Sequence, residues 1–179
     1  LASFGLTALL GFSLFPDADI PQFRIAVETP TGASLEDTDR AVRFIEAELQ
    51  RHEEVKHVFA NVGRGNPRVY YNIFPEEKKA NVAELFVELD GFDPQRTPAL
   101  LEGLRRTFAD YPGARIIVES YRNGPPINAP IEIAIVGPDL DQLQRLANEA
   151  EQQMLATPGT RNVDNPARRL RTDLDLAID

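Results

Sequence analysis

Apolar and polar positions follow two different periods along the first part of the chain, and each period predicts one kind of secondary structure. Strand-forming residues over 23–28 end at a Thr-Pro-Thr-Gly turn and predict a strand. Apolar residues then recur at steps of three and four to about Arg51 and predict an amphipathic helix, with Ser34 and Asp37 spaced as in a capping box. A second strand is predicted over 55–62, before a glycine-rich turn.

The next part of the chain repeats this order of strand, helix and strand. After a short edge strand or hairpin arm predicted over 69–73, the order starts again with a strand predicted over 82–89. A helix follows, with Thr97 as its cap and Pro98 at its first position, and its apolar stripe is made of leucine and phenylalanine. A strand over 116–119 completes the second unit, and the chain then enters a proline-rich linker.

A third unit begins after the linker and has the spacing of the first. A strand is predicted over 131–136, and Asp139 is the expected cap of a helix whose apolar stripe runs to Met154. Alternating apolar and polar residues over 170–178 predict a last strand.

Repeated strand-helix-strand units of this size have an apolar sheet face that a helix covers, and right-handed connections let two units share one sheet. The predicted fold class is therefore α+β, built from ferredoxin-like βαβ repeats. One complete βαββαβ sandwich is predicted over residues 20–120, and residues 128–179 supply only the first half of a second. Because half a sandwich leaves apolar surface uncovered, we expect it to pack against the first domain or against another copy.

The segment from Leu1 to Phe15 is apolar and has no charged side chain. It is too short to cross a bilayer alone, since a spanning helix needs about 20 residues, and it lacks the basic start of a signal peptide. We interpret residues 1–16 as the end of a first transmembrane helix and expect the chain to be a piece of a longer protein. The alternative is a buried helix of a soluble core.

Composition and charge narrow the classes of function. An apolar content of 42% in 179 residues is sufficient for a packed core. The chain has 28 acidic and 19 basic residues, a formal net charge of −9, so its surface repels a nucleic acid backbone. Cysteine is absent, which excludes disulfides, thiolate metal sites and cysteine nucleophiles.

The sequence shows no catalytic set, no metal-ligand spacing and no cofactor motif, so we do not predict an enzyme. His52 and His57 are the two imidazoles, and we expect both to be surface or packing residues. Arg105 and Arg106 lie beside the apolar stripe of their helix. They form a solvated face or, if the helix lines a pore, face the channel.

Two polar segments near strand ends are candidates for binding. Residues 120–123 read Ser-Tyr-Arg-Asn, and residues 161–169 combine amide and basic side chains. Loops held by a rigid scaffold often converge on one cleft, which is the functional interpretation. The alternative is ordinary loop chemistry.

Three segments in this order resemble the RND (resistance-nodulation-division) transporters. The apolar start runs into Leu-Phe-Pro at 14–16, residues 27–36 read Val-Glu-Thr-Pro-Thr-Gly-Ala-Ser-Leu-Glu, and residues 124–133 read Gly-Pro-Pro-Ile-Asn-Ala-Pro-Ile-Glu-Ile. The Pro-Gly-Thr-Arg-Asn-Val stretch at 158–163 fits as well, so the likeness spans essentially the whole chain.

The resemblance implies a periplasmic porter region of a proton-driven efflux transporter of the bacterial inner membrane. It implies a homotrimer that works with a periplasmic adaptor protein and an outer-membrane channel, and a helix over 97–110, with Arg105 and Arg106, that contributes to a central pore. The candidates that it implies for the substrate pathway are Ser120, Tyr121, Arg122, Asn123, Asn165 and Pro166.

Few aromatic residues stand at these candidate positions, which favours a more polar substrate than a typical multidrug pocket takes. A drug, a metal ion and a lipid-like molecule all stay open as substrates. The resemblance places the proton-relay residues in transmembrane helices outside this chain, so we expect the chain by itself neither to transport nor to catalyse. The alternative function is a ferredoxin-like regulatory or ligand-binding module of a soluble protein.

Overall fold

The computed structural model describes residues 15, 17–126, 129 and 131–168. The chain divides into two units, unit 1 at 1–126 and unit 2 at 127–179, and each is described by itself. The predicted end of a transmembrane helix over 1–16 lies outside the described residues, apart from Phe15. Among the described residues, no helix has both the length and the hydropathy that a membrane span requires.

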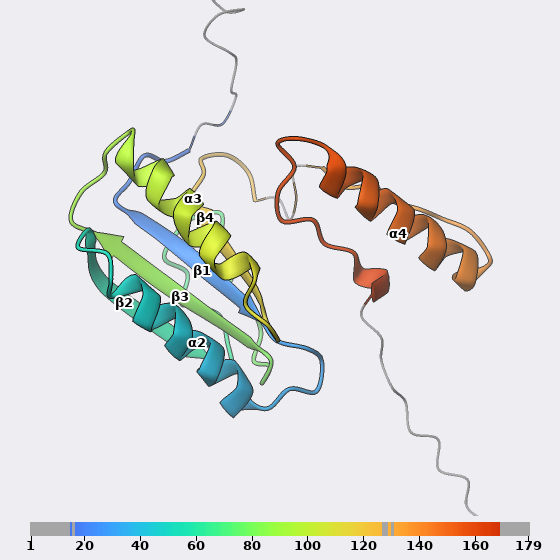
Figure 1. Cartoon of the computed structure of the whole chain (residues 1–179), viewed down its shortest axis with the longest axis horizontal. Helices are drawn as coiled ribbons and strands as arrows, with labels where there is room; N and C mark the ends of the chain where they lie inside the picture. Colours follow the sequence, from blue (N-terminus) through green and yellow to red (C-terminus); the bar gives the residue numbers. More distant parts are fainter. Residues whose placement is uncertain (1–14, 16, 127–128, 130, 169–179) are drawn as a thin grey trace, which may run out of the picture. The chain divides into compact units, whose positions relative to one another are not determined.

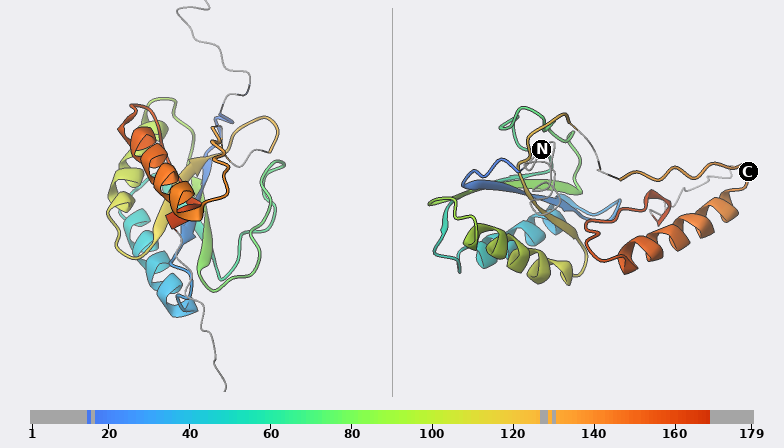
Figure 2. Two further views of the ribbon diagram at one scale, coloured as in Figure 1. Left: turned by 90° about the vertical axis from the view of Figure 1, so that its right-hand side faces the viewer. Right: turned by 90° about the horizontal axis from the view of Figure 1, so that it is seen from above.

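Unit 1 is a four-stranded antiparallel sheet with helices on one face (Figures 1 and 2). The sheet order is β2-β3-β1-β4, and every pair of neighbouring strands is antiparallel. The mixed α+β class predicted from the sequence is confirmed. In chain order the elements are β1 (Gln22–Glu28), α2 (Leu35–Leu49), β2 (Val55–Val62), β3 (Val82–Leu89), α3 (Arg96–Ala109) and β4 (Arg115–Ser120).

The core of unit 1 lies between the sheet and the two helices. Phe23, Ile25 and Val27 alternate along β1 and are at most 2% exposed, because successive strand residues point to opposite faces. The helices supply matching stripes at steps of three and four residues. The helical members of this core are Ala41, Val42, Ile45 and Leu49 from α2, with Leu101, Leu104 and Phe108 from α3.

The predicted capping box at the start of α2 is confirmed. The Ser34 hydroxyl accepts from the Asp37 backbone N–H (3.1 Å), and the Asp37 carboxylate accepts from the Ser34 backbone N–H (2.9 Å). These hydrogen bonds to Ser34 hold the pKa of Asp37 below its usual value. Two backbone donors at the helix start are thereby satisfied, which fixes where the helix begins.

The prediction that Thr97 caps α3 is wrong, because the capping contacts come from a residue four positions earlier. The helix begins at Arg96, and the carboxylate of Asp93 accepts from the backbone N–H groups of Gln95 (2.8 Å) and Arg96 (2.7 Å). Thr97 is already inside the helix, and its hydroxyl accepts from the Asp93 backbone N–H (3.0 Å). The Asp93 carboxylate accepts from two backbone N–H groups that have no partner within the helix, whereas the Thr97 hydroxyl accepts from the backbone N–H of Asp93 itself.

Unit 2 contains α4 (Leu140–Ala156) and the short 3-10 helix η1 (Pro166–Arg168). The predicted cap is confirmed, since the Asp139 carboxylate accepts from the Gln142 backbone N–H (3.0 Å). The predicted strand over 131–136 is not formed. A strand requires a hydrogen-bonded neighbour, and the other strand predicted in this unit, over 170–178, lies outside the described residues.

Candidate functional site

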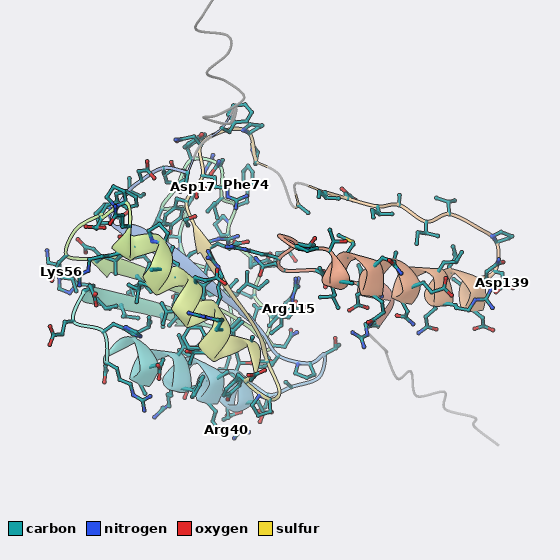
Figure 3. All side chains as sticks on the ribbon, turned by 45° about the horizontal axis from the view of Figure 1, so that its top comes forward. Asp17, Arg40, Lys56, Phe74, Arg115 and Asp139 are labelled. Atoms are coloured by element: carbon teal, nitrogen blue, oxygen red, sulfur yellow. The ribbon has the colours of Figure 1, made fainter. Side chains whose placement is uncertain are left out.

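Two loops meet on the sheet face of unit 1 that the helices leave uncovered (Figure 2). The first is the long β2–β3 loop, residues 63–81, and the second is the exit segment, residues 121–126, which follows β4. We call the side chains that join them, Tyr70, Tyr71, Asn72, Tyr121 and Asn123, the exit cluster. Figure 3 shows this end of unit 1, with Asp17 and Phe74 labelled.

Hydrogen bonds link three consecutive loop residues to the exit segment. The amide nitrogen of Asn72 donates to the backbone carbonyls of Arg122 (2.8 Å) and Gly124 (2.9 Å). The Tyr71 hydroxyl accepts from the Gly124 N–H (2.6 Å), and the Tyr70 hydroxyl donates to the side-chain oxygen of Asn123 (3.0 Å). The loop therefore recognises both the backbone and one side chain of a segment about fifty residues further along the chain.

Tyr121 is the buried centre of the exit cluster. Its side chain is 2% exposed, and its ring stacks on Tyr70 with centroids 4.8 Å apart and lies 6.5 Å from Phe86. Its hydroxyl is buried and makes no hydrogen bond with any described residue. Burial, together with the nearby Glu84 carboxylate, raises the pKa of Tyr121 to about 12, and the Arg24 guanidinium opposes this shift.

A polar network lies on the same face of the sheet, below the β2–β3 loop. Arg24 pairs with Glu119 (2.6 Å) and Glu84 (3.4 Å), and Glu84 is only 4% exposed. Burial alone would lower the pKa of Arg24, but the two carboxylates outweigh burial and raise it. The Glu84 carboxylate also accepts from the backbone N–H of Asn66 (2.9 Å), so one buried charge connects the sheet to the base of the loop.

The segment that enters β1 also contacts the exit segment. Arg122 pairs with Asp17 (3.1 Å), and the Ala18 N–H donates to the Tyr121 carbonyl (2.9 Å). Gly124 has φ +113°, and a Cβ atom there would lie 2.6 Å from the Phe15 ring. Both the backbone angle and the space therefore require glycine at this position.

The two predicted pore residues, Arg105 and Arg106, differ in their contacts. The Arg105 guanidinium donates to the carbonyl of Val118 (3.0 Å) on the edge strand β4 and pairs with Glu102 (3.4 Å). Arg106 is exposed, and its side chain makes no hydrogen bond with the described part of the chain. Arg105 therefore fastens α3 to the sheet edge, whereas Arg106 is available to solvent or to another surface.

The remaining candidates lie in unit 2, around one acid. Asn165 donates to Glu151 (3.0 Å) and to Asn148 (3.0 Å), and Arg168 pairs with the other oxygen of Glu151 (2.7 Å). Glu151 is 8% exposed although it carries a charge. Pro166 begins η1, the turn that brings Arg168 to α4.

The predicted candidates thus fall into two separate groups. Tyr121, Arg122 and Asn123 come together in unit 1, with Ser120 as the last residue of β4, while Asn165 and Pro166 belong to unit 2. Convergence of the two groups on one cleft stays a prediction. The described residues contain no group of three or more His, Cys, Asp or Glu side chains that could hold a metal ion.

Sequence reasoning missed the loop half of the exit cluster and both buried acids. The region around Tyr70 and Tyr71 was predicted as an edge strand, yet it is an ordered loop, and three of the four tyrosines of the chain gather there. Glu151 carried a usable signal, because it lies four residues after Ala147 and three before Met154, on the same side of the helix as the apolar stripe. Glu84 carried none, since an acid on the solvent side of a strand is the ordinary pattern.

Unit 1 is thus an α+β unit whose uncovered sheet face is polar and aromatic. The sequence model of the AcrB/AcrD/AcrF family matches residues 1–179. The chain therefore belongs to this family, and the resemblance to RND transporters is confirmed.

Solved structures with a similar fold include a heavy metal efflux pump in two crystal forms. Crystal form II is 20% identical, with a TM-score of 0.55, and the match covers 88% of this chain and 17% of that chain. Crystal form I is 23% identical over 66% of this chain and 13% of that chain, with a TM-score of 0.47. The chain thus spans less than a fifth of form II. No curated protein matches it.

Proposed function

We propose that this chain is part of the extracytoplasmic porter region of a proton-driven RND-type efflux transporter. The observation that carries the proposal is the match of the family model over residues 1–179. The fold of crystal form II, shared over 88% of this chain, supports it. On this proposal the transporter is a homotrimer in the bacterial inner membrane, and it exports with a periplasmic adaptor and an outer-membrane channel.

In this proposal residues 1–16 end the first transmembrane helix, residues 20–120 form the first porter subdomain with a ferredoxin-like fold, and residues 128–179 begin the second. Helix α3 contributes to the central pore. The difference between its two arginines supports Arg106 as the side chain that faces the pore, because Arg105 is engaged with Val118 at the sheet edge. The role of this region is passage of a substrate, with no catalytic step.

The exit cluster is the proposed wall of the substrate pathway in unit 1. Its tyrosine rings and amide groups suit an organic molecule with both aromatic and polar parts. The pump of crystal form II is a heavy metal exporter by its title, so metal ions belong in any test of the substrate. The described residues do not favour a metal ion, since they lack a cluster of metal ligands.

The test expresses the full-length transporter in a bacterial host that lacks its own pumps and measures resistance to dyes, detergents, antibiotics and metal ions. We expect protection against at least one compound and a clear loss of that protection with Asn123→Ala or Arg122→Gln. Arg43→Gln is the matched control, because Arg43 also forms a surface ion pair, with Asp39 (2.7 Å) on α2, far from the exit segment in sequence.

Membrane levels of each variant are compared by immunoblot, so that loss of protein is distinguished from loss of export. Equal resistance for Asn123→Ala, Arg122→Gln and the parent would remove the exit cluster from the pathway. No protection against any compound would contradict the export function itself.

A further inference from the structure

We propose that the β2–β3 loop is a latch that fixes the direction in which the chain leaves unit 1, and that Asn72 is its principal positioning residue. The linker between the two units begins where the latch closes, since unit 1 ends at Pro126. The proposal concerns a contact within unit 1 and adds a conformational role to a loop that the proposed function uses only as a wall.

The tip of the loop binds the exit segment through its backbone. Asn72 is the central contact because one amide group bridges the carbonyls of Arg122 (2.8 Å) and Gly124 (2.9 Å), which spans the whole turn between them. The Tyr71 hydroxyl accepts a hydrogen bond from the backbone N–H of Gly124 (2.6 Å). Backbone contacts of this kind fix the path of the segment whatever side chains it carries.

Contacts within unit 1 fix the base of the loop, and this base positions the tip next to the exit segment. Hydrogen bonds between Gly63 and Val82 (2.8 Å) and between Gly65 and Glu76 (3.2 Å) form a narrow stem. A Cβ atom at Gly65 would clash with the backbone of Glu76 and touch Glu84, so only glycine permits this approach. Buried Glu84 then anchors the loop through the N–H of Asn66 (2.9 Å).

The direction set at Gly124 is carried onward by the residues that follow it. Pro125 and Pro126 come next, and consecutive prolines restrict the backbone to an extended, stiff path. A change in the backbone at Gly124 therefore redirects the start of the linker, instead of being absorbed within a flexible segment.

The latch has the features of a contact that opens and closes. The hydrogen bonds of Tyr70, Tyr71 and Asn72 to the exit segment are at or near the surface, where water competes for the same groups. Closing the latch leaves the Tyr121 hydroxyl buried without a partner among the described residues, so opening would give that hydroxyl access to water. The closed state is favoured by the contacts at the tip, and it leaves one hydroxyl at its centre without a hydrogen bond.

The test is a distance measurement between the units in the full chain. Cysteine is absent, so Lys56→Cys and Gln152→Cys, both exposed, give a single spin-labelled pair for double electron–electron resonance. We expect a broader or shifted distance distribution for Asn72→Ala than for the parent. Thr107→Ala is the matched control, because the Thr107 hydroxyl also donates to a backbone carbonyl, that of Gly103 (3.1 Å), within the same unit but outside the loop. We expect it to leave the distribution unchanged.

Two further measurements separate loosening of the latch from loss of structure. A label pair at Lys56 and Asp110, both exposed and both in unit 1, should keep its distance in Asn72→Ala. Tyr71→Phe removes only the acceptor, and hydrogen exchange at the Gly124 amide should become roughly fivefold faster, which corresponds to one lost hydrogen bond. A distribution in Asn72→Ala as narrow as that of the parent, or equal broadening in Thr107→Ala, would overturn the proposal.

Discussion

The two faces of the unit 1 sheet are built from the same strands but stabilised in opposite ways. The helix-covered face carries Phe23, Ile25 and Val27, all at most 2% exposed, and needs no polar partner. The face under the β2–β3 loop carries Arg24 and Glu84 and is closed by hydrogen bonds and stacked rings. The first face supplies stability, and the second, whose contacts are directional and partly open to water, is suited to binding and movement.

The largest loss of stability is expected from a substitution in the apolar core, on the helix-covered face. Ile45 is 0% exposed in the cluster between α2 and the sheet. Ile45→Ala should lower the free energy of unfolding by about 2–5 kcal/mol, because it removes buried methyl groups and leaves a cavity. Urea unfolding followed by circular dichroism measures the change. A loss below about 1 kcal/mol would mean that this face does not supply most of the stability.

A smaller loss is expected from the buried acid of the polar face. Glu84→Ala leaves Arg24 with one carboxylate and the Asn66 N–H without its acceptor. It should lower the free energy of unfolding by about 2–3 kcal/mol. The matched variant Glu119→Gln alters the other partner of Arg24, whose side chain is 36% exposed, and should cost under about 1 kcal/mol. Equal losses in urea unfolding for the two variants would show that burial of Glu84 is unimportant.

The pH dependence of stability should report on Tyr121. Its pKa rises to about 12 in the fold, from about 10 in an unfolded chain, so its contribution is fully present below pH 10 and is lost as the pH rises toward 12. That contribution is roughly 3 kcal/mol, because each pKa unit corresponds to about 1.4 kcal/mol. Tyr121→Phe should flatten the fall in stability between pH 10 and 12, measured by urea unfolding at each pH. An unchanged slope in the variant would place the alkaline sensitivity elsewhere.

The smallest predicted difference lies between two neighbouring arginines. Arg105→Ala removes a hydrogen bond to the Val118 carbonyl at the sheet edge and should cost about 1 kcal/mol. Arg106→Ala should change the stability of the isolated chain by less than about 0.5 kcal/mol, because Arg106 is exposed on α3. Thermal unfolding of the two variants gives the comparison. A larger loss for Arg106→Ala would reverse the assignment of these two side chains.

The sequence predicted the helix-covered face well because its signals are local and periodic. Strand alternation around Ile25, helical spacing around Ile45 and the capping box of Ser34 with Asp37 all follow from residues within a few positions of one another. The same logic predicted the cap at Asp139. At α3 it assigned the cap to Thr97, whereas the carboxylate that accepts from the backbone N–H groups at the helix start is that of Asp93, because both residue types cap helices.

The loop-covered face was predicted only in part, because its contacts join residues about fifty positions apart. Tyr121 and Asn123 were named as candidates from their residue types, but their shared partner Tyr70 was assigned to an edge strand. No periodicity marks a pairing between a loop and a distant linker. The predicted strand over 131–136 failed for a related reason, since a strand depends on a partner that its own residues do not determine.

The central claim is that the loop-covered face lies on the substrate pathway and the helix-covered face is scaffold. Its most direct test introduces Asn123→Cys or Arg43→Cys into a cysteine-free form of the full-length transporter, modifies each with a bulky maleimide, and measures export of a compound that the resistance panel identifies. We predict that modification at Asn123 blocks export and that export protects the cysteine from modification, while modification at Arg43 has no effect. Equal export after both modifications would contradict the claim.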